Sequence, residues 1–160
     1  MTVEIVSFDA WYKRESSTVF KAVSLALADV DLAEEATAEA FARAWASWER
    51  VQAMVSPVGW VYRVALNLAK SRWRRDRLRR AWTAARVVPG PEAPDDEVWR
   101  AVAGLTPRAR LAVSLRYIAD LPELEIARVM GVARGTVAAT LHNARTQLAL
   151  ELANTQEVPW

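Results

Sequence analysis

The sequence predicts an all-α protein of two small helical domains joined by a Pro-rich flexible linker, the second of which contains a helix-turn-helix. Three observations support this fold class. Apolar residues recur at helical spacing through most of the chain, and no alternating apolar-polar run of strand length persists. Residues 87–97, VVPGPEAPDDE, combine three Pro, one Gly and several acids, which neither continue a helix nor supply a core. We therefore expect domains at 1–86 and 98–156 with a linker at 87–97.

Composition excludes several classes of protein. Of the 160 residues 52% are apolar, which is ample for a buried core. The chain has no Cys and a single His, so it has no disulfide, thiolate zinc site or cysteine nucleophile, and a transition-metal site is not expected. The N-terminus lacks a basic segment followed by an apolar run. We expect a cytoplasmic protein without a cofactor, metal or membrane contact.

The positive charge is concentrated in one segment. The formal net charge is +2, yet residues 70–80, KSRWRRDRLRR, hold seven cations and one acid. Favourable interaction with a helix dipole accounts for about two of these cations. The rest predict that one surface binds a polyanion. Nucleic acid fits better than an anionic membrane, because apolar residues become sparse where the cations begin.

The first domain is expected to hold three helices. The first covers about 8–28. The second is expected to begin at an Asp31 N-cap, with Glu34 completing a capping-box pattern. Helical spacing places four apolar residues on one face of the second helix, namely Phe41, Ala44, Trp45 and Trp48. We expect Phe41 and Trp45 to be core residues.

A third helix is predicted from Pro57, with Ser56 as its cap, and its 24 residues to Arg80 would span about 36 Å. Its cationic end must stand clear of the core, because beyond Ala69 the cations lie on nearly every side. One polar stripe follows helical spacing: Arg63, Asn67, Lys70 and Arg74. The cations can bind backbone phosphates, and the Asn67 amide can form paired hydrogen bonds with a base edge. Aromatic groups that could stack on bases are Trp60, which is more often a core residue, Tyr62 and Trp73.

The second domain contains a helix capped by Thr106, with Pro107 at its first position. Residues 121–152 then predict two apolar-faced helices joined at Gly131, the pattern of a helix-turn-helix. A helical hairpin with a Gly turn would give the same pattern, so that alternative stays open here.

Residues 31–45, 56–75 and 105–148 together resemble the two conserved domains of bacterial RNA polymerase sigma factors of the extracytoplasmic-function (ECF) group. The three blocks occur in the family's order, with the linker between the second and the third. The resemblance implies a promoter-specificity subunit that binds core RNA polymerase, recognises the minus-10 and minus-35 elements and promotes DNA opening. Such a protein has no catalysis of its own. An anti-sigma factor or another regulator is a further partner that many members of this family have.

The resemblance also suggests residue roles. Core-polymerase binding falls on Glu35, Glu39 and Arg43, whose acids form an exposed row able to meet a basic surface. Binding of minus-10 DNA falls on the end of the third helix, at Arg63, Asn67, Lys70, Trp73, Arg74, Arg75 and Arg77, with the loop 52–58 setting the accepted base. Binding of minus-35 DNA falls on the recognition helix, at Arg134, Thr136, Ala138, Ala139, His142 and Arg145.

The chain departs from the family pattern in two places. Ala38 stands where the family commonly has Gln, which removes a polar contact with polymerase. The family often has Lys-Ser-Arg after G-T-V, whereas this chain has Ala138, Ala139 and Thr140. Because fewer cations then meet phosphates, the salt dependence of binding falls, and minus-35 binding is expected to be weak or to rely on thymine methyl groups. Two other functions therefore stay open: a sigma-like decoy that binds polymerase or a regulator without directing initiation, and a dimeric helix-turn-helix repressor.

Overall fold

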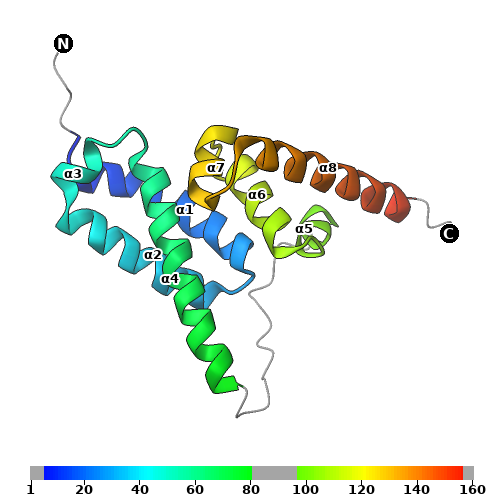
Figure 1. Cartoon of the computed structure of the whole chain (residues 1–160), viewed down its shortest axis with the longest axis horizontal. Coiled ribbons are helices and arrows are strands. Elements are labelled where there is room, and N and C mark those ends of the chain that lie inside the picture. Colours follow the sequence, from blue (N-terminus) through cyan, green and yellow to red (C-terminus); the bar gives the residue numbers. More distant parts are fainter. Residues whose placement is uncertain (1–5, 81–96, 157–160) are drawn as a thin grey trace.

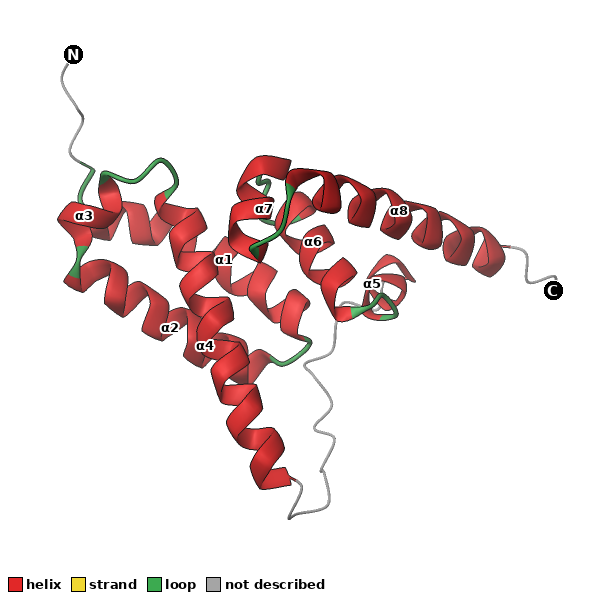
Figure 2. Cartoon of the chain, in the orientation of Figure 1, coloured by secondary structure: helices red, strands yellow, loops and turns green. Residues whose placement is uncertain are grey.

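The computed structural model describes residues 6–80 and 97–156, and every regular element in these two ranges is a helix (Figure 2). The helices in the first range are α1 Phe8–Leu27, α2 Val30–Ala46, α3 Trp48–Gln52 and α4 Pro57–Arg80. Those in the second are α5 Glu97–Ala103, α6 Pro107–Tyr117, α7 Glu123–Met130 and α8 Arg134–Gln156. The all-α prediction is confirmed. Most of the predicted linker, 87–96, lies outside the described residues, and the exact domain limits stay a prediction.

Two caps predicted from the sequence are confirmed. The Ser56 hydroxyl oxygen accepts a hydrogen bond from the Gly59 backbone N–H at 3.1 Å, and α4 begins at Pro57. In the same way the Thr106 hydroxyl oxygen accepts from the Ala109 N–H at 3.3 Å at the start of α6. Both caps satisfy backbone donors that the first helical turn leaves without partners.

The predicted N-cap of α2 is wrong. Asp29, not Asp31, caps this helix, and its carboxylate accepts from the Leu32 N–H at 3.0 Å. The cause lies one residue earlier, because Ala28 ends α1 in a left-handed conformation with φ 52°. That turn returns the chain to extended backbone at Asp29, so α2 starts sooner and Asp31 falls in its first turn.

The prediction that Trp48 continues the second helix is also wrong. α2 ends at Ala46, Ser47 leaves the helical conformation with φ −125° and ψ 31°, and Trp48 begins the short helix α3. The change of direction brings Trp48 back onto the start of α1, where its ring lies 4.8 Å from that of Trp11. Its indole N–H donates to the Val6 carbonyl oxygen at 3.3 Å. Only 53–56 of the predicted loop remains non-helical before α4.

The helix-turn-helix prediction is confirmed. Gly131 ends α7 with φ 67°, a left-handed conformation that Gly adopts without the steric cost of a side chain. Two residues follow before α8 begins at Arg134. Ile126 of α7 and Val137 and Leu141 of α8 are fully buried, which fixes the two helices against the rest of the domain.

The two domains pack against one another. α1 contacts α2 and α4 on one side and α6 on the other, and α4 also contacts α7 (Figure 1). The buried apolar side chains of both domains form one continuous cluster. Gly59 of α4 lies where the two domains meet, since a Cβ at this position would lie 2.7 Å from the Ser56 Oγ and 3.0 Å from the Glu125 Oε2 atom of α7. Sequence patterns did not predict this contact between domains.

Candidate nucleic-acid and polymerase interfaces

The C-terminal half of α4 forms a cationic surface that extends beyond α1 and α2 (Figure 1). All the residues of the predicted polar stripe, Arg63, Asn67, Lys70 and Arg74, are exposed, and so is Arg75. On the other side of the helix Val61 is fully buried, while Val64 and Leu68 are half-buried. The sequence prediction that this end stands clear of the core is therefore confirmed. The side chain of Arg77 lies outside the described residues.

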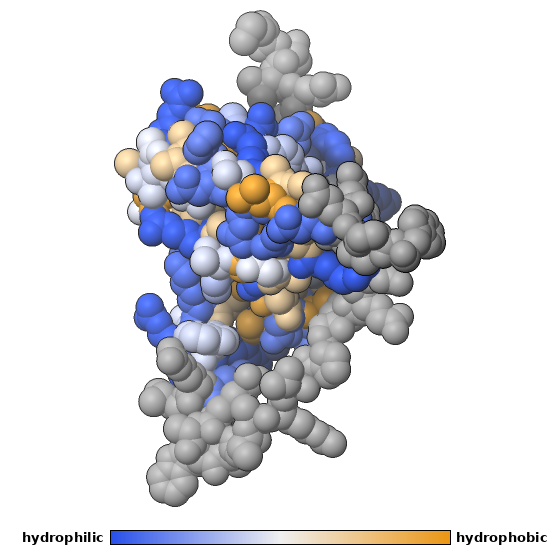
Figure 3. All heavy atoms as spheres, turned by 90° about the vertical axis from the view of Figure 1, so that its right-hand side faces the viewer, coloured by the Kyte–Doolittle hydropathy of each residue, from blue (hydrophilic) through white to orange (hydrophobic). Residues whose placement is uncertain are grey.

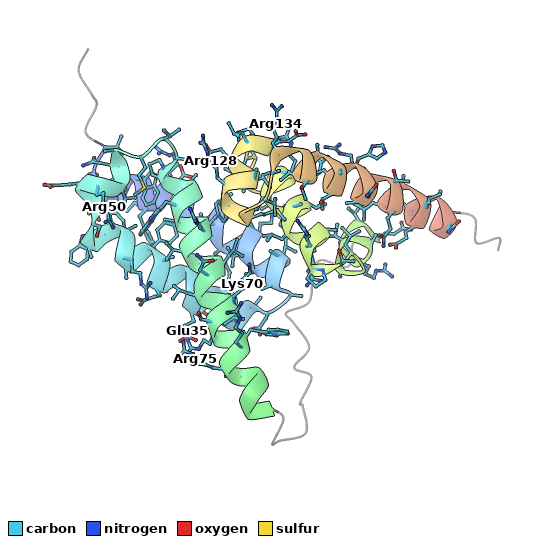
Figure 4. The ribbon with its side chains drawn as sticks, viewed as in Figure 1. Glu35, Arg50, Lys70, Arg75, Arg128 and Arg134 are labelled. Atoms are coloured by element: carbon cyan, nitrogen blue, oxygen red, sulfur yellow. The ribbon has the colours of Figure 1, made fainter. Side chains whose placement is uncertain are left out.

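The predicted acidic row on α2 is exposed, but its charges have partners within the chain. Glu35 forms an ion pair with Arg72 of α4, and Glu39 accepts from the Arg43 Nε at 2.9 Å. Figure 4 shows Glu35 beside the cationic half of α4, where Lys70 and Arg75 project. Exposed ion pairs contribute only about 0–1 kcal/mol, so exchange for the charges of a binding partner costs little.

Trp45 differs from its predicted burial. Phe41 is buried, as predicted, but Trp45 is 67% exposed, so its assignment to the core is wrong. Together with Trp48, Glu49 and Arg50 it lines a shallow depression at the end of α2. Figure 4 shows Arg50 at this end of the domain, away from the cationic half of α4.

The three aromatic residues predicted to stack on bases differ sharply in exposure. Trp73 is 53% exposed and Trp60 is half-buried, whereas Tyr62 is 1% exposed. The predicted stacking role of Tyr62 is therefore wrong, because α4 turns this ring into the core of the domain. Burial raises the pKa of the Tyr62 hydroxyl well above its ordinary range, and the negative charge of Glu15 raises it further.

The helix-turn-helix carries its predicted minus-35 residues on the outer side of α8. Arg134, Ala139, His142 and Arg145 are exposed, while Thr136 and Ala138 are half-buried. Figure 4 shows Arg128 and Arg134 at the helix-turn-helix, on the opposite side of the molecule from the cationic end of α4. The two candidate DNA surfaces thus point apart in this arrangement.

One contact near α8 was missed by sequence reasoning. The Arg145 Nε donates a hydrogen bond to the Tyr117 hydroxyl oxygen at 2.6 Å, and its guanidinium carbon lies 5.8 Å from the centre of the Tyr117 ring. Tyr117 ends α6, and 28 positions separate it from Arg145. No local pattern links residues so far apart, so the fold alone reveals the pair.

Comparison with known families matches both domains. Residues 11–79 match Sigma-70 region 2, and residues 95–148 match Sigma-70, region 4. The chain belongs to the sigma-70 class of RNA polymerase subunits. Within that class it is a sigma factor of the ECF group, as the sequence blocks predicted.

Similar proteins agree with this assignment. The chain is 25% identical over 159 residues to the RNA polymerase sigma-E factor of Streptomyces coelicolor, covering 93% of this chain and 88% of that protein. It is 27% identical over 159 residues to the ECF RNA polymerase sigma factor BldN of the same species, covering 91% and 60%. The sigma factor RpoE of Bartonella quintana, solved in complex with the anti-sigma factor NepR, shares the fold with a TM-score of 0.71 at 18% identity, covering 89% of this chain and 96% of that one.

The chain is therefore a promoter-specificity subunit that acts in transcription initiation, and its partners are core RNA polymerase and promoter DNA. Within residues 6–80 and 97–156, no helix combines the length and the apolar character needed to cross a membrane. The face formed by the α5 and α8 end of the molecule is mostly hydrophilic, with apolar residues in small groups (Figure 3).

Proposed function

We propose that this sigma factor divides its work among three surfaces. The cationic half of α4 binds minus-10 DNA, the outer side of α8 binds minus-35 DNA, and α2 binds core polymerase. The observation that carries the proposal is the cationic half of α4, which extends clear of the core with exposed cations on several sides. We also infer that the protein acts in the cytoplasm and catalyses no reaction itself.

At the minus-10 element, the cations along α4 neutralise backbone phosphates, which positions the DNA without reading its sequence. Asn67 lies within the same stripe, where its amide can make paired hydrogen bonds to a base edge. Trp73 offers an exposed ring on which an unpaired base can stack. The loop before α4 presents Val55, which is 90% exposed, as an apolar surface for a base turned out of the duplex.

At the minus-35 element, binding is weak because α8 presents few cations to the DNA, and the cations nearby also have acidic partners. Arg128 pairs with Glu125 at 3.1 Å, and Arg134 lies 3.6 Å from Glu123. Ala138 and Ala139 contribute no charge, but their methyl groups can contact thymine methyls in the major groove. Polymerase must then hold this domain on the DNA.

The packed arrangement of the two domains cannot serve both elements at once. The two elements lie about 25 base pairs apart, which is about 85 Å along the duplex. A compact chain of this length has a radius of gyration of about 15 Å. The contacts of α1 with α6 and of α4 with α7 therefore open when the promoter is bound, and core polymerase stabilises the open arrangement.

The second candidate function is a sigma-like decoy, and the uncharged Ala138 and Ala139 favour it. A regulator of the anti-sigma kind, like the one bound to the Bartonella relative, is a further partner that we infer for this chain. A decoy would bind polymerase and still fail to open any promoter.

Two double variants test the division of labour. Lys70→Ala with Arg74→Ala should weaken promoter opening, measured by permanganate reactivity of unpaired thymines, and leave core binding unchanged. Glu35→Arg with Glu39→Arg should weaken core binding, measured by fluorescence anisotropy of the labelled sigma factor. If both double variants lose the same step, the assignment of separate surfaces is wrong.

A further inference from the structure

We propose that Tyr117 and Arg145 together bind a phosphate of the DNA backbone at the edge of the minus-35 element. This inference rests on the proposed function of α8. Arg145 supplies the charge, and Tyr117 is a positioning residue that holds the guanidinium in place. The sequence predicted that Arg145 binds minus-35 DNA but assigned no role to Tyr117.

The geometry of the pair favours ligand binding from the solvent side. The Tyr117 hydroxyl accepts the Nε–H of Arg145 at 2.6 Å, and the guanidinium lies 5.8 Å from the ring centre. Both side chains are exposed, and Tyr117 retains 55% of its surface. The hydrogen bond uses one of the five guanidinium N–H donors, so four remain for a phosphate.

The charge of Arg145 is not neutralised by its partner. Other cations near the helix-turn-helix lie beside acids: Arg116 near Asp120 at 3.7 Å, Arg128 near Glu125 at 3.1 Å, and Arg134 near Glu123 at 3.6 Å. A phosphate that approached any of these cations would first compete with a carboxylate. Arg145 is held by a neutral phenol instead, so its full positive charge is available to an anion.

The position of Arg145 along α8 fits the backbone rather than the bases. It lies eleven residues beyond Arg134, the first residue of α8, which corresponds to about 16 Å along the helix. The major groove is about 12 Å wide, and the N-terminal residues of a recognition helix contact its base edges. A side chain about 16 Å further along therefore reaches the sugar-phosphate strand that borders the groove.

The same helical side carries a second polar group. His142 is exposed and precedes Arg145 by three residues, which places the two side chains on one side of α8. Val137, Leu141 and Ala144 form the buried side of α8, and Arg145 lies at its edge, four residues after Leu141. Arg145 and Tyr117 therefore lie at the border between the exposed side of α8 and its contact with α6, where both side chains stay open to solvent.

The test measures the affinity of the complete holoenzyme for a promoter duplex identified by start-site mapping, over a range of salt concentrations. The variants are Arg145→Ala, Tyr117→Phe and the combination of both. Tyr117→Phe keeps the ring and removes the hydroxyl. Tyr12→Phe is the matched control, because Tyr12 is an exposed tyrosine of α1 in the other domain.

Arg145→Ala should lower the slope of log affinity against log salt concentration by about 0.9, the value for one phosphate contact. Tyr117→Phe should weaken binding about threefold, the effect of one hydrogen bond, and should have a smaller effect when Arg145 is already Ala. A duplex with one neutral methylphosphonate beside the minus-35 element should lose affinity for the wild type and not for Arg145→Ala.

An unchanged salt slope in Arg145→Ala, or an equal effect of Tyr117→Phe in both backgrounds, would overturn the phosphate-binding pair. If the wild-type holoenzyme initiates at no specific site, the proposed function fails first and the role of the pair fails with it. Specific initiation by the wild type together with unaffected variants would reject the pair alone.

Discussion

Arg110 and Ala26 join the two domains through a hydrogen bond. The Arg110 Nε of α6 donates to the Ala26 carbonyl oxygen in the last turn of α1 at 3.1 Å. Carbonyl groups in the last turn of a helix have no partner within the helix, and this end of the helix dipole is negative. The guanidinium of Arg110 comes from the other domain, donates to one of these carbonyl groups and places a positive charge at the negative end of the dipole. Arg110 therefore stabilises the packed arrangement.

Arg110→Ala should therefore shift the free protein toward the open arrangement. Loss of a hydrogen bond to a charged group costs about 1.5 kcal/mol, a change of about tenfold in the population. Because the chain has no Cys, Ser17→Cys and Ala149→Cys can carry two dyes, and energy transfer between them should fall in Arg110→Ala. Arg108→Ala, on the same helix, is the control that should leave the transfer unchanged. Equal transfer in both variants would contradict a role of Arg110 between domains.

Trp45 should contribute to polymerase binding and not to stability. A large aromatic group that is 67% exposed on the proposed polymerase-binding helix has the character of an interface hot spot. Trp45→Ala should weaken core binding by about tenfold or more and change the free energy of unfolding by less than about 0.5 kcal/mol. Trp11→Ala is the contrast, since Trp11 is 5% exposed and its removal should cost about 3 kcal/mol. Normal core binding by Trp45→Ala would place the polymerase contact elsewhere.

The start of α2 provides a matched pair of aspartates. Asp29→Ala should lower the free energy of unfolding by about 1 kcal/mol, because it removes the side-chain acceptor of the Leu32 N–H. Asp31→Ala should cost less, because Asp31 lies in the first turn, where its charge has a weaker favourable interaction with the helix dipole. Urea denaturation of both variants measures the difference. A larger loss for Asp31→Ala would move the cap back to the position that the sequence first predicted.

Tyr62 should make stability depend on alkaline pH. The folded state raises the pKa of its hydroxyl, so the folded protein holds this proton more tightly than the unfolded chain, in which tyrosine titrates near pH 10. The contribution to stability is complete below about pH 10 and falls as the pH rises above it. Tyr62→Phe should reduce this fall between pH 9 and pH 11 in urea denaturation, whereas Tyr12→Phe should not. An unchanged pH dependence in Tyr62→Phe would contradict the proton linkage.

Tyr62→Phe has a second expected effect. The buried hydroxyl has no hydrogen-bond partner among the described residues, so its removal should not destabilise the protein at neutral pH. This result also serves as the folding control for the alkaline measurement.

Local chemistry was predictable from the sequence wherever one short segment determines it. Ser56 with Pro57 and Thr106 with Pro107 carry both the side-chain cap and the fixed φ of a first helical residue. The Gly131 turn was predictable for the same reason. In contrast, the choice between Asp29 and Asp31 depends on a left-handed Ala28, and alanine does not signal that conformation.

Burial at the ends of helices was harder to predict. Ala40 and Ala44 define the centre of the buried side of α2, and Trp45 lies at its margin in the last turn, where the other described helices leave most of its ring exposed. The pairs Glu35 with Arg72, Arg110 with Ala26, and Tyr117 with Arg145 all join different helices. Such contacts depend on how the helices pack, which periodicity within each helix does not specify.

Through the surfaces described, this sigma factor is expected to direct core polymerase to specific promoters. The most direct measurement is single-round transcription from fragmented genomic DNA of the source bacterium, by core polymerase with and without the protein, with mapping of the transcript starts. We predict new starts that share an upstream motif, and their loss with Lys70→Ala combined with Arg74→Ala. Core binding without any new start would contradict promoter-directed initiation and favour the decoy.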